Sequence, residues 1–335
     1  MRKAINYDVG IAVSPDWPSR PDFDPATVRR ELRIIHDDLG CEAVRIFGED
    51  PHRLRVAGEY AVAAGLQVWL SPDLANAGQS AWLEHLSTCA RIARDLGAGD
   101  TVFVLGRELT FFQHGLVHGK DPFARMRTFT SIPRLLGNLV LKGSWNRNLN
   151  RFLAKAREVV RAEFGGPLTY ASGVWEKVDW SDLDIVSVDL YRDASNEADF
   201  PARLAPYLDH GKPVAITEFG CCTYRGAANK GATGWAVIDR SARPRRLKEP
   251  LERDEAEQAC YLTELLDVFA AGNVDTAFAF SFASYSYLYD EDPMLDLDRA
   301  AYGIVRCLPS DSGTTYPGLA WEPKEGFAAF GRWGR

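Results

Sequence analysis

The feature that most constrains the fold is a regular alternation of short apolar segments with longer amphipathic ones. The short segments are rich in β-branched and aromatic residues, which is typical of buried strands. The expected strands cover 5–13, 43–47, 66–71, 101–106, 167–172, 184–191, 213–220 and 276–285. The longer segments carry apolar residues at helical spacing, and several end beside a glycine that can adopt the left-handed conformation. The expected helices cover 25–40, 51–65, 80–97, 148–164, 200–211, 254–272 and 325–333.

Strands that alternate with helices predict a parallel sheet, and eight such units predict its closure into a (β/α)8 TIM barrel. We expect one domain over residues 1–335, with no helix between the fifth and sixth strands. A doubly wound open sheet is the alternative, but no G-x-G-x-x-G turn follows an early strand. Long segments at 109–147 and 220–253 follow the fourth and seventh strands, so they are expected over the carboxyl end, where such barrels build their sites.

Charge and hydropathy exclude several classes of partner. The formal net charge of −7 argues against nucleic acid, because phosphate binding needs a concentrated basic surface. The basic cluster Arg240, Arg243, Arg245, Arg246 and Lys248 is expected to be a solvated loop. No apolar stretch approaches about 18 residues and no signal peptide is evident, so we predict a cytoplasmic protein with no membrane partner. The oligomeric state is left open.

Neither a metal nor another cofactor is expected. The six cysteines show no zinc-binding spacing, and they are interpreted as reduced thiols, although a redox role for Cys221 and Cys222 is conceivable. His114 and His118 are spaced i, i+4, which could place two imidazoles on one helical face. Glycines interrupt that segment and no third ligand is evident, so contact with substrate or a plain loop is the favoured interpretation.

Two glutamates stand at the ends of otherwise apolar strands. Glu108 follows the fourth strand in VFVLGRELTFF, and Glu218 ends the seventh in VAITEFG. In a barrel both strand ends point into the same mouth. Cleavage of a glycoside needs two carboxyl groups there, one protonated to donate to the leaving oxygen and one ionised to attack or to activate water. Asp8 and Asp189 also lie in or at the end of strands and could reach the mouth, or be structural.

Several motifs resemble the clan A glycoside hydrolases, and together they span nearly the whole chain. The matching segments are VLGREL, VSVDLY, VAITEFG, FAFSF, AAYGIV and WEPKEGFAAF. The resemblance implies retaining cleavage of a β-glycosidic bond, with Glu108 as general acid/base and Glu218 as nucleophile. It further implies that Tyr191 orients the nucleophile and that Arg45 lies near it, where a guanidinium would help to keep Glu218 ionised.

The chain departs from the family pattern at two places. Arg107 stands where the family normally has the asparagine that contacts the sugar. An arginine there would suit an anionic group and would tend to lower the pKa of Glu108, unless it faces away or pairs with an acidic neighbour. After the eighth strand the chain has Phe280, Phe282 and Tyr285 in place of the usual tryptophan. Tyr285, Trp175 and Trp235 are therefore candidates for contact with a sugar face.

Three functions remain in competition. The leading hypothesis is a glycosidase acting on a small-molecule or glycoconjugate substrate. The second is a barrel enzyme recruited to another reaction on an anionic small metabolite, which Arg107 would bind. The third is a carbohydrate-binding barrel without turnover, which the two retained carboxyl groups disfavour.

Overall fold

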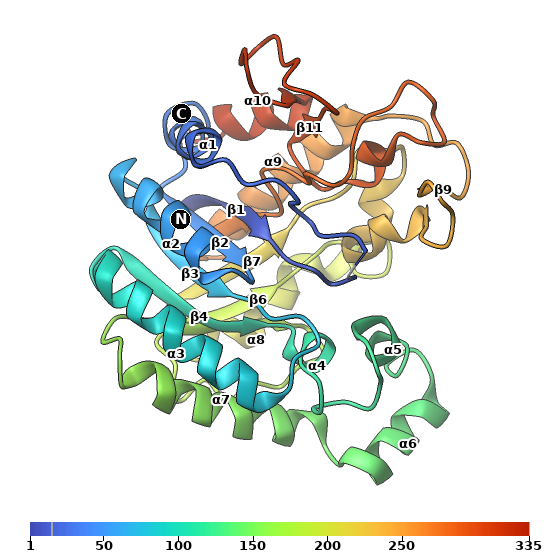
Figure 1. Cartoon of the computed structure of the whole chain (residues 1–335). Helices are drawn as coiled ribbons and strands as arrows, with labels where there is room; N and C mark the ends of the chain where they lie inside the picture. Colours follow the sequence, from blue (N-terminus) through green and yellow to red (C-terminus); the bar gives the residue numbers. More distant parts are fainter. Residues whose placement is uncertain (15, 335) are drawn as a thin grey trace.

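The computed structural model describes residues 1–14 and 16–334 and contains a closed barrel of eight parallel strands, in the order β1-β10-β7-β6-β5-β4-β3-β2 (Figure 1). The barrel strands are β1 (Arg2–Gly10), β2 (Ala43–Gly48), β3 (Gln67–Pro72), β4 (Thr101–Arg107), β5 (Leu168–Gly173), β6 (Val186–Asp189), β7 (Val214–Phe219) and β10 (Thr276–Ala279). The predicted (β/α)8 barrel is confirmed.

Helices follow most strands and cover the outside of the barrel (Figure 1). The α-helices are α1 (Pro25–Asp37), α2 (Pro51–Ala63), α3 (Gln79–Leu96), α4 (Leu109–Phe112), α5 (Pro122–Met126), α6 (Ile132–Lys142), α7 (Trp145–Arg161), α8 (Ala205–Leu208), α9 (Glu255–Ala271) and α10 (Glu325–Arg332). As expected, the described chain has no helix between β5 and β6. None of the helices in residues 1–14 and 16–334 is long and apolar enough to cross a membrane.

Several predicted elements differ from the structure; the helix expected at 148–164, for example, begins and ends three residues earlier. The first strand begins and ends three residues earlier than expected, since Gly10 leaves the strand at φ 117°, a conformation that favours glycine. The expected helix at 200–211 is instead a 3-10 helix, η1 (Glu197–Leu204), followed by the short α8, because Pro201 and Pro206 cannot donate helical hydrogen bonds. The eighth strand ends at Ala279, and the following loop supplies Phe280 and Ser281 to the cavity described below.

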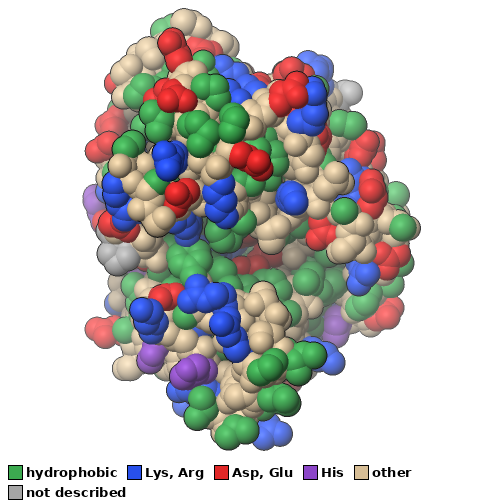
Figure 2. Space-filling model, turned by 90° about the vertical axis from the view of Figure 1, so that its right-hand side faces the viewer, with side chains coloured by type: hydrophobic (Ala, Val, Ile, Leu, Met, Phe, Trp, Pro, Cys, Tyr) green, Lys and Arg blue, Asp and Glu red, His purple; other side chains and the backbone are tan. Residues whose placement is uncertain are grey.

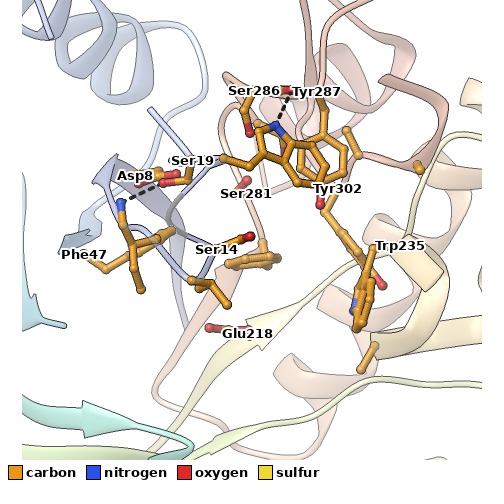
Figure 3. A pocket seen from close by; sticks show the side chains of 18 of the residues that line it. Asp8, Ser14, Ser19, Phe47, Glu218, Trp235, Ser281, Ser286, Tyr287 and Tyr302 are labelled. Atoms are coloured by element: carbon orange, nitrogen blue, oxygen red, sulfur yellow. Dashed lines mark hydrogen bonds between the residues drawn. The ribbon is translucent and has the colours of Figure 1, made fainter. Parts of the chain in front are cut away.

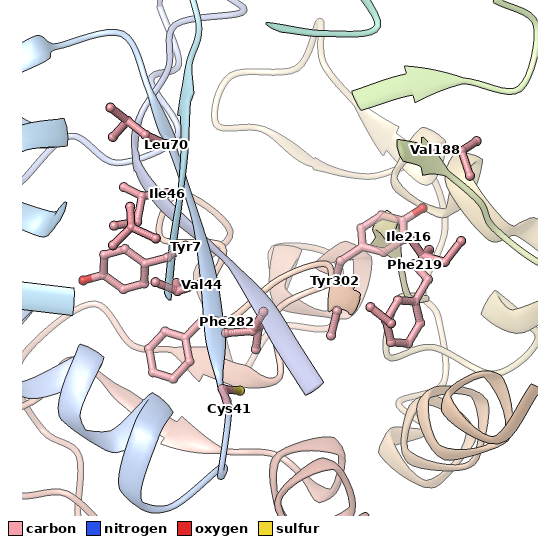
Figure 4. Packing of buried hydrophobic residues seen from close by; sticks show 14 of the residues in the cluster. Tyr7, Cys41, Val44, Ile46, Leu70, Val188, Ile216, Phe219, Phe282 and Tyr302 are labelled. Carbon is pink, nitrogen blue, oxygen red and sulfur yellow. The ribbon is translucent and has the colours of Figure 1, made fainter. Parts of the chain in front are cut away.

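Successive side chains of a strand point to opposite faces of the sheet, so the barrel strands contribute to two cores, one outside the barrel and one inside it. On β1, Ile5, Tyr7 and Val9 belong to the large core between strands and helices, part of which Figure 4 shows. Ala4, on the same strand, belongs to a second cluster. That second cluster consists of Ala4, Ala43, Trp69, Val102, Val104, Ala171, Ala215 and Phe278. Small alanines leave room there for the rings of Trp69 and Phe278, whose centroids are 4.8 Å apart.

The two long segments lie at the carboxyl end of the barrel. The segment after β4 folds into α4, α5 and α6 before α7 returns along the barrel (Figure 1). The segment after β7 contains η2 (Ala227–Val237) and a two-stranded hairpin of β8 (Ile238–Asp239) and β9 (Arg246–Leu247). Both segments contribute side chains to one cavity, so they form walls above the strand ends.

Candidate active site

A cavity of about 260 Å³ opens at the carboxyl end of the barrel. Figure 2 looks onto this end and shows a hollow lined by hydrophobic side chains, with acidic groups in its depth. In Figure 3 Asp8 and Trp235 lie on opposite sides of the cavity, and Glu218 lies at the end of a strand between them. The charged residues that line the cavity are Asp8, Arg107, Glu108, Glu218 and Arg240.

The carboxyl group of Glu218 is held by two donors. Arg45 on β2 is fully buried, and its Nη1 donates to Oε1 of Glu218 at 3.0 Å. The hydroxyl group of Tyr191, two residues beyond β6, donates to Oε2 at 3.1 Å. Arg45 is itself fixed by hydrogen bonds to Asn6 Oδ1 and Ser71 Oγ, both at 3.2 Å. Rigid neighbours on three strands thus set the position of Glu218.

Glu108 comes directly after β4 in a left-handed conformation, with φ 39°, and its backbone N–H donates to Ala171 O at 2.9 Å. Desolvation is the main cause that raises the pKa of its carboxyl group well above the ordinary value, and the nearby carboxyl groups of Asp189 and Glu218 raise that pKa further. Arg107 lowers the pKa of Glu108, as expected, but the opposing causes are stronger. A raised pKa favours the protonated form that a general acid requires.

The guanidinium group of Arg107 forms an ion pair with an acidic neighbour. Its Nε donates to Oδ2 of Asp73 at 2.6 Å, and its guanidinium carbon lies 4.3 Å from the centroid of the Phe112 ring. Asp73 is almost fully buried, so the two charges form a largely desolvated pair at the edge of the cavity. Of the interpretations that the sequence left open, the pairing with an acid is the one found in the structure. Asp73 already neutralises the charge that was expected to attract an anionic ligand.

Asp189 adds a third carboxyl group, which the sequence left open between the mouth and a structural role. It ends β6, is paired in register with Glu218 on β7, and is 4% exposed. Burial, followed by the charge of Glu218, raises the pKa of Asp189 well above the usual range. A side-chain hydrogen bond with Thr217 favours its ionised form, but these opposing causes are stronger.

Replacing Asp189 by asparagine is therefore expected to stabilise the fold increasingly as pH rises. The pKa of Asp189 is higher in the folded state than in the unfolded state. The free energy of unfolding of the wild type therefore falls as pH rises from the unfolded-state pKa to the folded-state pKa. Each pKa unit of that shift is worth about 1.4 kcal/mol at alkaline pH. Urea unfolding at about pH 5 and about pH 9 measures the difference. The exposed Asp209→Asn variant is the control, and a pH-independent gain in Asp189→Asn would contradict the expectation.

The three aromatic residues predicted to contact substrate have different surroundings. Trp235 lines the cavity. Trp175 does not belong to the cavity lining; its ring stacks on Phe111 at 4.2 Å and its Nε1 donates to Thr110 Oγ1 at 2.9 Å. Tyr285 is also outside the lining, because its hydroxyl group donates to Glu31 at 2.8 Å. Packing and hydrogen bonding thus hold Trp175 and Tyr285 away from the cavity.

The loops supply cavity residues that sequence reasoning missed. Trp17, from the loop after β1, stacks on Tyr287 with ring centroids 4.9 Å apart. Arg240 was expected in a solvated loop, but it is half-buried: its guanidinium carbon lies 4.3 Å from the Phe123 ring centroid and 4.9 Å from that of Trp235. No strand or helix pattern marks these positions, since the residues meet only when separate loops fold together.

In the part of the chain that the structure describes, the histidines and cysteines form no metal site. Within residues 1–14 and 16–334, no group of three or more His, Cys, Asp or Glu side chains could hold a metal ion. All six cysteines are free thiols, and only Cys260 is exposed. Burial raises the pKa values of Cys221 and Cys222, which disfavours the reactive thiolate form.

Comparison with known proteins finds similar barrels among solved structures, although not among sequences. No family model and no curated protein sequence matches the chain. Among solved structures it is similar to a GH113 β-1,4-mannanase, with a TM-score of 0.60, 15% identity and coverage of 99% of this chain and 98% of the other. The GH113 β-mannanase AaManA of Alicyclobacillus acidocaldarius gives a TM-score of 0.56 at 16% identity, covering 92% and 91%.

A third similar structure is Cel5A of Thermotoga maritima in complex with mannotriose, with a TM-score of 0.52, 13% identity and coverage of 89% of this chain and 96% of the other. At such low identity the likeness concerns the fold alone. The chain thus shares its barrel fold with these three structures, and all three are glycoside hydrolases by their names or bound ligands.

Proposed function

We propose that the protein is a retaining glycoside hydrolase that cleaves a β-glycosidic bond by double displacement. The observation that carries this proposal is the contrast between two glutamates at one cavity. Glu108 has a raised pKa, whereas Glu218 accepts hydrogen bonds from the Arg45 guanidinium and the Tyr191 hydroxyl group. Environments that separate two carboxyl groups in this way assign the acid and the nucleophile.

In the first step a carboxylate oxygen of Glu218 attacks the anomeric carbon, while Glu108 transfers its proton to the leaving oxygen. This step forms a glycosyl ester on Glu218 and releases the aglycone. In the second step Glu108, now ionised, removes a proton from water, which attacks the anomeric carbon and frees Glu218. Arg45 and Tyr191 serve as positioning residues, because they fix both oxygens of the nucleophile.

A sugar is the substrate that the cavity walls suit. Trp17, Trp235 and Tyr287 present aromatic rings at the cavity, and such rings stack on the apolar faces of pyranosides. Two of the similar barrels are named β-mannanases and the third was solved with mannotriose. β-Mannosides are therefore the first substrates to assay. The alternative of an anionic metabolite is weakened by the pairing of Arg107 with Asp73.

The stereochemistry of the product tests the mechanism. A panel of aryl β-glycosides and β-linked oligosaccharides identifies a substrate, and proton NMR then follows the anomeric signals of the first product. We expect the β-anomer to form first and to equilibrate later with the α-anomer. Initial release of the α-anomer would contradict double displacement and indicate a single inverting step. Binding of oligosaccharides without turnover would favour the non-catalytic barrel instead.

A further inference from the structure

The helix α6 (Ile132–Lys142) exposes its apolar face to solvent. Ile132, Leu136, Leu139 and Val140 follow the spacing i, i+4, i+7, i+8 and are 73%, 59%, 44% and 86% exposed. This spacing places them on one face of a helix, the face that a helix of a globular protein normally buries. Asn138, in contrast, is 2% exposed, and its Oδ1 accepts a hydrogen bond from the His118 N–H at 2.8 Å. The helix therefore buries a polar side chain, Asn138, while it exposes this apolar face to solvent.

The chain around this helix is strongly basic. Residues 122–157 contain eight Lys and Arg residues and no Asp or Glu, although the whole chain has a net charge of −7. Two of these cations are already used: Arg125 is buried, and Arg157 pairs with Asp182. Four others are exposed around α6 and have no ion pair within residues 1–14 and 16–334; they are Arg127, Arg134, Lys142 and Arg147. We call these four cations and the apolar residues Ile132, Leu136, Leu139 and Val140 the α6 patch; Leu141, which is 64% exposed, lies on another side of the helix.

We propose that the α6 patch docks the protein on an anionic lipid surface. An amphipathic helix that lies in the membrane interface combines an exposed aliphatic face with flanking Lys and Arg residues, and each basic residue near the surface adds attraction to acidic lipid headgroups. The overall negative charge does not oppose this strongly, since at physiological salt charges act over only about 8 Å. Docking of this kind needs no membrane-spanning helix, although it departs from the sequence-based expectation that the protein has no membrane partner.

Two other occupants fit the patch less well. A second copy of the chain would bring the same four cations against themselves across a two-fold axis, and like charges in contact are unfavourable. A single-stranded nucleic acid would use aromatic side chains for base stacking, whereas the exposed face of α6 is aliphatic. An aliphatic face with a basic border is complementary to acyl chains below anionic headgroups.

The position of the patch links it to the cavity. Phe123 and Met126 of α5 line the cavity, and α6 begins six residues after Met126. Figure 2 shows hydrophobic side chains gathered at the lower end of the face that carries the mouth, with Lys and Arg side chains near them. A protein resting on α6 would hold its cavity beside the lipid surface, which suits a substrate displayed there. This last consequence rests on the proposed glycosidase function; the docking itself does not.

Vesicle co-sedimentation of the whole protein tests the docking. We expect binding to vesicles of phosphatidylcholine with about 30% phosphatidylglycerol, weaker binding to phosphatidylcholine alone, and a loss of binding as salt is raised. Val140→Asp should lower the vesicle partition coefficient on the order of tenfold, because it places a charge in the inserted face. The matched control is Val174→Asp, since Val174 is an exposed valine outside the patch and the cavity lining.

A charge variant keeps the test independent of any folding defect in Val140→Asp. Arg134→Gln should weaken binding to the anionic vesicles about fivefold, whereas Arg246→Gln, an exposed arginine on β9, should leave it unchanged. Equal binding of wild type and both patch variants, or equal binding to neutral and anionic vesicles, would overturn the proposal. A concentration-dependent dimer in light scattering that Val140→Asp abolishes, without vesicle binding, would assign the patch to a second copy. None of these measurements depends on turnover, so the docking proposal and the proposed glycosidase function are tested independently of each other.

Discussion

Replacing Glu218 by glutamine is expected to lower kcat by on the order of 10⁴-fold or more while the barrel stays folded. Glutamine keeps the size of the side chain, its carbonyl oxygen can still accept a hydrogen bond from Arg45, and its amide N–H group can donate to the hydroxyl oxygen of Tyr191. It cannot form the glycosyl ester, so the first step of double displacement is lost. Steady-state kinetics on the best substrate of the glycoside panel measure the effect, and circular dichroism reports whether the fold is retained.

Two further measurements make the Glu218 result specific. The exposed Glu252→Gln variant is the matched control and should leave turnover unchanged. With Glu218→Ala, azide should enter the space left by the side chain, restore part of the rate on an activated aryl glycoside and produce the α-glycosyl azide. Full activity of Glu218→Gln would remove Glu218 from the chemistry. A β-glycosyl azide would instead exchange the roles proposed for Glu218 and Glu108.

The fold followed from local patterns. Strand β7 is a mostly apolar run that carries Glu218 directly before its last residue, and α7 shows a clear helical period, so both could be predicted from composition and spacing. The eight alternating units were compatible with a barrel or with a doubly wound open sheet. The barrel was favoured because no G-x-G-x-x-G turn, which the open sheet would need, follows an early strand. The errors lie at boundaries, where single residues decide: Gly10 ends β1 early, and two prolines prevent a long helix before β7.

The candidate site was only partly predictable. Strand ends are fixed by the barrel, so placing Glu108 and Glu218 at one mouth needed nothing beyond the topology. The direction of the Arg107 side chain could not be predicted, because its partner Asp73 lies 34 residues away in the loop after another strand. Tyr285 likewise needed Glu31 of α1, whose carboxylate holds the tyrosine hydroxyl outside the cavity. Contacts of this kind form between loops of variable length, and one sequence contains no signal for them.

Replacing Glu108 by glutamine is expected to have an effect that depends on the leaving group. General acid catalysis contributes about 10²–10⁴-fold, so oligosaccharides and alkyl glycosides should lose rate to that extent. A dinitrophenyl glycoside needs little protonation of its leaving oxygen, so its first step should be nearly unaffected, and the glycosyl ester on Glu218 should then accumulate. Mass spectrometry of the quenched reaction detects that ester, and stopped-flow absorbance detects the accompanying burst of dinitrophenol.

The pH dependence provides the decisive comparison for Glu108. Desolvation and the neighbouring carboxyl groups raise the pKa of Glu108, so wild-type kcat/KM should fall on the alkaline side at a pH above the ordinary range of a glutamate. In Glu108→Gln that alkaline limb should disappear, because the group whose deprotonation produces it is gone. Glu49→Gln is the matched control: Glu49 directly follows β2 but does not line the cavity, and its alkaline limb should stay in place. An unchanged limb in Glu108→Gln would mean that another group supplies the proton. Asp189, with its own raised pKa, would be the first to test.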